Sequence, residues 1–142
     1  MSSYISNSLK AQIEQEDRQR CCYCLTSEAN SGIPMTFDHI QPRSKGGATS
    51  FENVCLACRT CNEYKSDSIE AEDPLTGEFV RLFNPRTQQW SEHFTWCLDA
   101  TKVEGVTAIG RATVAALRMN NPVIVAARYR WTISGWYPPE TL

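Results

Sequence analysis

The sequence contains no apolar run near the ~20 residues that a membrane-spanning helix needs. Residues 1–20 are too polar for a secretory signal peptide. Internal repeats and low-complexity stretches are absent, and no glycine pattern of the form Gly-x-Gly-x-x-Gly occurs. These absences argue against a membrane protein and against a dinucleotide-binding fold. We therefore expect a cytoplasmic protein with no membrane partner.

Charge of one sign is also scarce, since the 142 residues carry a net charge of −2. This balance alone argues against a nucleic-acid partner, but the charges are unevenly distributed. Residues 1–78 hold 7 basic and 12 acidic side chains, whereas residues 79–142 hold 7 and 4. If the protein contacts phosphates, the second half and the local pair Arg43 and Lys45 would supply much of the attraction.

Cysteine, in contrast, is abundant, and its odd count of seven argues against a closed disulfide framework. Cys21-x-x-Cys24 and Cys58-x-x-Cys61 are two pairs separated by 33 residues. One such pair could be a redox motif, whereas two predict a closed tetrahedral Cys₄ site for structural zinc, with another metal or a degenerate site as alternatives. The other cysteines are expected to be small apolar side chains, the one beside Cys21 being an alternative ligand. They are Cys22, Cys55 and Cys97.

The first half reads as a helix, a strand, a glycine-containing loop, a short return strand and a second helix. A zinc ion bound by both cysteine pairs would hold the two strands against the second helix. An acidic, turn-rich connector at residues 70–78 then marks a seam. The expected ranges are a helix over 5–19, strands over 35–40 and 54–57 with a loop over 42–53 between them, and a helix from residue 58.

The second half reads as strands followed by two helices, so we expect an α+β fold with domains at 1–73 and 74–142, the second packed on the first. Thr107 and Pro122 are placed to start the helices, and Gly135 to end the second one. The expected core face of that second helix is Val123, Ala127 and Trp131. The expected ranges are strands over 79–83, 93–98 and 102–107, and helices over 108–120 and 122–134.

Four polar residues lie within or beside the segment that the cysteine pairs would clamp. Asp38 and His39 are adjacent in the predicted strand, Asn53 follows 14 residues after His39, and Asn62 comes directly after the last cysteine. Phosphodiester hydrolysis needs an activated water, and histidine is the side chain suited to accept its proton near neutral pH. Asp38, on the opposite side of the strand, and Asn62 offer oxygen ligands for Mg²⁺ or Mn²⁺.

The segments "FDHIQPRSKGG", "FENV" and "CRTCNEYKSD" together resemble the HNH motif of the His-Me finger (ββα-metal) endonucleases, in a variant with Asn at the third position. The resemblance covers residues 18–68. It implies a treble-clef-like ββα-metal core with His39 as general base, a divalent metal on Asp38 and Asn62, and Asn53 pinning the loop and orienting His39. The second half resembles the C-terminal extension of small bacterial HNH proteins.

Several basic residues are candidates for contacts with nucleic-acid phosphates, although each is also compatible with a solvated surface. Arg111 and Arg118 are seven residues apart and would share a helix face, which suits either backbone contact or an ion pair with the acidic half. His93 is expected to pack or hydrogen-bond within the extension. The phosphate candidates are Arg43, Lys45 and Lys65, and the further arginines on the two C-terminal helices are Arg128 and Arg130.

These features predict a metal-dependent DNA endonuclease that leaves 5′-phosphate and 3′-hydroxyl ends. One alternative is a nucleic-acid-binding zinc module without catalytic activity. Another is the nuclease subunit of a larger defence or mobile-element complex, in which the extension binds a protein partner or a second copy of the chain.

Overall fold

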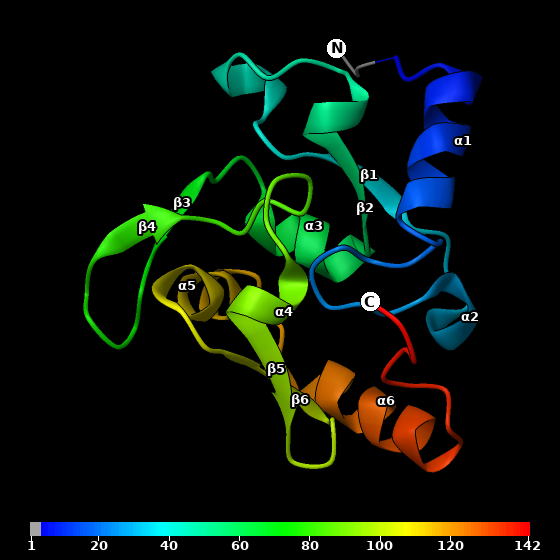
Figure 1. Cartoon of the computed structure of the whole chain (residues 1–142), viewed down its shortest axis with the longest axis vertical. Helices are drawn as coiled ribbons and strands as arrows, with labels where there is room; N and C mark the ends of the chain where they lie inside the picture. Colours follow the sequence, from blue (N-terminus) through cyan, green and yellow to red (C-terminus); the bar gives the residue numbers. More distant parts are fainter. Residues whose placement is uncertain (1–3) are drawn as a thin grey trace.

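Three two-stranded antiparallel sheets and the helices between them make up residues 4–142 of the protein, described by a computed structural model (Figure 1). The expected α+β class is confirmed. No helix within residues 4–142 is long and apolar enough to cross a membrane. In chain order the first half contains α1 (Asn7–Glu16), α2 (Glu28–Ser31), β1 (Thr36–His39), the 3₁₀ helices η1 (Arg43–Lys45) and η2 (Phe51–Asn53), β2 (Val54–Ala57) and α3 (Arg59–Lys65).

The second half adds two further hairpins and the two longer C-terminal helices. Thr107 caps the first of these helices by accepting a hydrogen bond from the Gly110 amide, and Pro122 occupies the first turn of the second, as expected. The elements are β3 (Glu70–Glu72), β4 (Phe79–Arg81), α4 (Trp90–His93), β5 (Phe94–Cys97), β6 (Lys102–Gly105), α5 (Ala108–Ala116) and α6 (Pro122–Ile133).

The β1–β2 hairpin and α3 form the ββα unit that carries the predicted site. β1 pairs with β2 so that Asp38 lies opposite Cys55 and His39 opposite Val54. All four residues of β2 are buried, and α1 packs against this strand. The helix α3 lies against β1, as Figure 1 shows.

The two halves share one hydrophobic core, with residues on both sides of the expected boundary between residues 73 and 74. That boundary falls in the turn of the β3–β4 hairpin, whose strands come from either side of it. The indole Nε1 of Trp90 donates to the Tyr23 carbonyl at 2.7 Å, and the Tyr137 hydroxyl donates to the Cys24 carbonyl at 3.0 Å. The second half therefore packs directly on the first cysteine pair.

A buried ion pair also joins the halves. Arg86 donates two hydrogen bonds to the Asp17 carboxylate, at 2.6 and 3.0 Å, and two more to the carbonyls of Phe51 and Val54. Asp17 in turn accepts from the Leu56 amide at 2.9 Å. This cluster ties the end of α1 and the start of β2 to the extension.

Bounds expected for the first helix, for the loop and for the first C-terminal helix differ from the structure. The first helix ends at Glu16 and not at 19, because Arg18 and Gln19 adopt left-handed backbone conformations. The loop over 42–53 contains η1 and η2. The helix expected over 108–120 ends at Ala116 and is followed by a left-handed Arg118.

The predicted core face of α6 is confirmed at Trp131, which packs against the core, and is wrong at Val123. Val123 is 81% exposed, whereas Arg128 is fully buried. The core side of this helix therefore contains an arginine that hydrophobic spacing alone assigns to the surface.

We predict that Arg86→Met lowers the free energy of unfolding by about 3–5 kcal/mol, because it leaves the buried Asp17 carboxylate without its cation. Urea denaturation would measure the loss. The matched control is Arg43→Met, which removes an exposed arginine and is expected to change stability by less than about 0.5 kcal/mol. Equal losses in the two variants would contradict the assigned role of Arg86.

Candidate nuclease site

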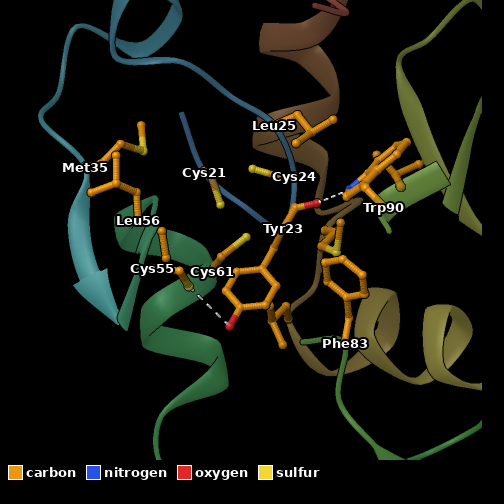
Figure 2. Packing of buried hydrophobic residues seen from close by; sticks show 14 of the residues in the cluster. Cys21, Tyr23, Cys24, Leu25, Met35, Cys55, Leu56, Cys61, Phe83 and Trp90 are labelled. Carbon is orange, nitrogen blue, oxygen red and sulfur yellow. Dashed lines mark hydrogen bonds between the residues drawn. The ribbon is translucent and has the colours of Figure 1, made fainter. Parts of the chain in front are cut away.

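The four thiols of the two cysteine pairs converge, as the spacing predicts. The Sγ atoms of Cys21, Cys24, Cys58 and Cys61 all lie within 4.8 Å of one another. Figure 2 shows the sulfurs of Cys21, Cys24 and Cys61 pointing toward one another beside α3. Cys58 caps α3, since its Sγ accepts the Cys61 amide at 3.4 Å. Four thiolates at this separation fit a tetrahedral zinc ion, which needs no further ligand.

The pKa values of the clustered thiols are shifted by burial and by their hydrogen bonds with one another. Burial raises the pKa of the Cys21 thiol, whereas hydrogen bonds from the neighbouring cysteines, Cys21 first, lower the pKa of Cys24. Metal binding would displace the thiol protons through which the four sulfurs hydrogen-bond one another. Cys22 is not part of the cluster: it lies beside Cys55, whose hydrogen bond raises its pKa.

His39 lies on the opposite face of β1 from Asp38, as strand alternation requires. Its Nε2 lies 2.9 Å from the Thr49 hydroxyl, and the imidazole is half-buried. Desolvation lowers the pKa of His39, and nearby Arg43 and Lys65 lower it further, while Asp38 opposes them. Thr49 therefore holds the ring in place, and burial favours its neutral form.

Asn53 fastens the loop that follows His39. Its side-chain oxygen accepts from the Gln41 amide at 2.8 Å, and its side-chain nitrogen donates to the carbonyls of Gln41 and Ala48 at 3.0 and 2.7 Å. Gly47 permits this closure, because a Cβ there would lie 1.7 Å from the Gln41 carbonyl oxygen. The Asn53 carbonyl also accepts from the Ile40 amide, next to His39.

Asp38 is buried and both of its carboxylate oxygens are occupied. Tyr23 donates its hydroxyl to Oδ2 at 2.8 Å, and Lys65 donates to Oδ1 at 3.2 Å. The Lys65 ammonium also contacts the carbonyls of His39 and Ile40, at 3.1 and 3.2 Å, and is only 1% exposed. Burial raises the pKa of Asp38, although Lys65 and Tyr23 both favour its charged form.

Asn62 lies beside Thr36 on the same seam between α3 and β1. Its side-chain nitrogen donates to the Thr36 hydroxyl at 2.9 Å, and Thr36 donates onward to the Ala57 carbonyl. Because Asn62 and Lys65 are three residues apart on α3, they share the face that meets β1. On that face the Lys65 ammonium contacts the Asp38 carboxylate.

Asp38 and Asn62 thus do not form an open cation site in this arrangement. An ammonium group already contacts the carboxylate that a divalent cation would need, and the Asp38 side chain is 4% exposed. The expected magnesium or manganese site at these residues does not fit the geometry until Lys65 leaves Asp38.

The three predicted phosphate contacts differ in accessibility. Arg43 is exposed and close enough to His39 to affect its pKa. Lys45 is exposed but its ammonium donates to the Asp67 carbonyl at 2.7 Å. Lys65 is buried in the ion pair described above, so its expected role at the surface is not met here.

The arginines and the second histidine of the extension have contacts of their own. Arg111 forms an ion pair with Asp73, with two contacts of 2.9 Å that hold the Asp73 pKa far below its usual range. Of the two roles left open for Arg111, the structure therefore has the ion pair. Arg118 lies over the Tyr64 ring at 4.6 Å. His93 hydrogen-bonds Thr107 at 2.6 Å, as expected for a residue of the extension.

Two residues that contact the site are not identifiable from the sequence motifs. Thr49 holds His39, and Tyr23 holds Asp38 from within the first cysteine turn. A loop threonine carries no sequence signal of this role. Tyr23 lies between two metal-ligand cysteines, which is its only indication (Figure 2).

Comparison with known families identifies this unit. Residues 21–74 match the family model described as HNH endonuclease. The matched segment contains the four-cysteine cluster, the β1–β2 hairpin and α3, and the cluster is consistent with a Cys₄-zinc variant. The resemblance to HNH endonucleases is confirmed over this segment, which indicates nuclease activity in general. No curated protein and no solved structure matches the chain.

We predict that Lys65→Met lowers the free energy of unfolding by about 3–5 kcal/mol, because Asp38 would remain buried without its cation. Adding Asp38→Asn removes that uncompensated charge, so the double variant should be more stable than the sum of the two single effects implies. Urea denaturation of the wild type, the two single variants and the double variant gives the four free energies of a double-mutant cycle. Additive effects would mean that the two groups do not interact.

Proposed function

We propose that the protein is a DNA endonuclease in which His39 is the general base for hydrolysis of the phosphodiester backbone. The observation that carries the proposal is the fixed, neutral imidazole of His39 inside the segment that matches HNH endonucleases. One ring nitrogen contacts Thr49, and among residues 4–142 no hydrogen bond reaches Nδ1. In the tautomer that donates Nε2–H to Thr49, Nδ1 is the nitrogen that accepts a proton from water.

In this scheme water loses its proton to Nδ1 as its oxygen bonds to phosphorus. The bond from phosphorus to the 3′-oxygen breaks, which leaves a 5′-phosphate and, after protonation, a 3′-hydroxyl. Asn53 acts as a positioning residue, because it closes the loop around His39 and Thr49. Our candidate for a contact with the DNA backbone is Arg43, which is exposed and near enough to His39 to lower its pKa.

The metal ions of the proposal have different support. Zinc at the four cysteines would be structural, holding the loop after α1 to the start of α3. HNH endonucleases use a divalent metal, and Mg²⁺ or Mn²⁺ remains our expectation for this protein, with Asp38 and Asn62 as ligands only after Lys65 has moved. No step of the scheme above depends on that ion.

His39→Ala is expected to lower the rate of nicking of supercoiled plasmid, in the presence of Mg²⁺ or Mn²⁺, by at least a hundredfold. A general base usually contributes a factor of about 10²–10⁴ to the rate. The matched control is His93→Ala, which removes the only other histidine of the chain and should retain activity. Zinc content and circular dichroism should be unchanged in both variants.

Retained cleavage by the His39 variant would remove this residue from its role. DNA binding without cleavage by the wild type would favour the alternative of a binding module. Activity only in a complex isolated with another protein, tested by size-exclusion chromatography with light scattering, would favour a nuclease subunit.

The pH dependence provides a separate test. The His39 pKa lies below its ordinary value of 6.5, since burial disfavours the imidazolium. Below that pKa the base is protonated and inactive, so the nicking rate should rise with pH and reach half its plateau below pH 6.5. A midpoint above pH 7 in single-turnover rates would contradict the assignment.

A further inference from the structure

The helix α6 buries an arginine that has no anionic partner among residues 4–142. Arg128 is 0% exposed, and its Nη1 donates to the Thr101 carbonyl at 3.2 Å and to Asn120 Oδ1 at 3.1 Å. Its Nε and Nη2 are buried and have no hydrogen-bond partner. A buried charge without a counter-charge costs several kcal/mol, so a partner for it should exist in the functional protein.

The Nε and Nη2 atoms of Arg128, which have no partner, form the edge of the guanidinium that can donate two parallel hydrogen bonds to one anion. Arg111, in the same chain, uses its own Nε and Nη2 to hold both oxygens of Asp73. In Arg128 this fork is complete, buried and unused.

Arg128 lines a cavity of about 100 Å³ together with Cys24, Cys58 and Cys61, three of the four clustered cysteines. Among residues 4–142 no acidic side chain lines this cavity, so within that range the thiols are the groups in its wall that can carry negative charge. Tyr137 connects the two sides, because its ring lies 5.8 Å from the Arg128 guanidinium carbon while its hydroxyl donates to the Cys24 carbonyl.

A zinc ion with four thiolates carries a net charge of −2, and this charge would share the cavity wall with one buried guanidinium, that of Arg128, and with two exposed ones, those of Arg59 and Arg118. The cavity has room for water, so the N–H groups can act on the sulfurs through bound water. Hydrogen-bond donors around a metal site tune its affinity and its ligand basicity.

We propose that Arg128 is the charge-balancing partner of the zinc tetrathiolate and slows zinc release. This inference rests on the zinc site of the proposed function but not on nuclease activity. It assigns a task to the C-terminal extension, which lies outside the family match: α6 completes the electrostatic environment of the metal ion.

The test compares zinc release from Arg128→Gln, Arg128→Lys and the control Arg130→Gln, an exposed arginine two residues away on the same helix. Each purified protein is mixed with a chromogenic zinc chelator, and its initial zinc content is measured by elemental analysis. Arg128→Gln should release zinc about 10-fold faster than wild type, Arg128→Lys should lie between them because it keeps the charge without the fork, and Arg130→Gln should match wild type.

A thermal readout distinguishes this role from simple packing. Addition of zinc should raise the Tm of Arg128→Gln less than that of wild type, whereas a packing defect would lower Tm equally with and without zinc. If Arg128→Gln does not fold, Arg128→Lys is compared with Arg130→Lys, and faster release is again expected.

Equal release from the Arg128 and Arg130 variants would overturn the inference while leaving the zinc site intact. Equal release from Arg128→Gln and Arg128→Lys, both faster than wild type, would overturn the charge-balancing role. Wild-type protein without bound zinc would refute the zinc site itself, and the role of Arg128 with it.

Discussion

The convergence of four cysteine thiols is the constraint on which the candidate site depends. It brings the turn after α1 to the start of α3, and so closes a loop that contains the whole β1–β2 hairpin. Within that loop, Asn53 closes a smaller one around His39 through three side-chain hydrogen bonds. A short hairpin is marginally stable alone, so the clamp and the packing of α1 and α3 are what hold it.

Charge burial distinguishes the two faces of β1. On one face Asp38 is paired with Lys65 and Tyr23 in the interior. On the other, His39 is half-buried, neutral and next to the exposed Arg43. The buried ion pair of Asp38 and Lys65 therefore lies on one face of the strand, and the side chain that meets substrate in our proposal lies on the other. The Lys65 ammonium also contacts the backbone carbonyl of His39.

The extension is part of the same folding unit. Arg86 reaches Asp17 and β2, Trp90 reaches Tyr23, and Tyr137 reaches Cys24. These contacts place groups from the second half around the first cysteine turn, although only residues 21–74 match the HNH family. Because the core is shared, changes in α6 are expected to reach the cysteine cluster.

The sequence by itself determined the local features: the two cysteine pairs, the strand positions of Asp38 and His39, and the helix that carries Asn62. Each depends on spacing along one element or across one turn, which residue order dictates. Only the tertiary structure decided which charges meet. Lys65 and Arg128 read as surface cations because lysine and arginine are rarely buried, yet both are enclosed where elements distant in the chain pack together. The partner of a buried charge depends on that packing, which the spacing of residues along the sequence does not reveal.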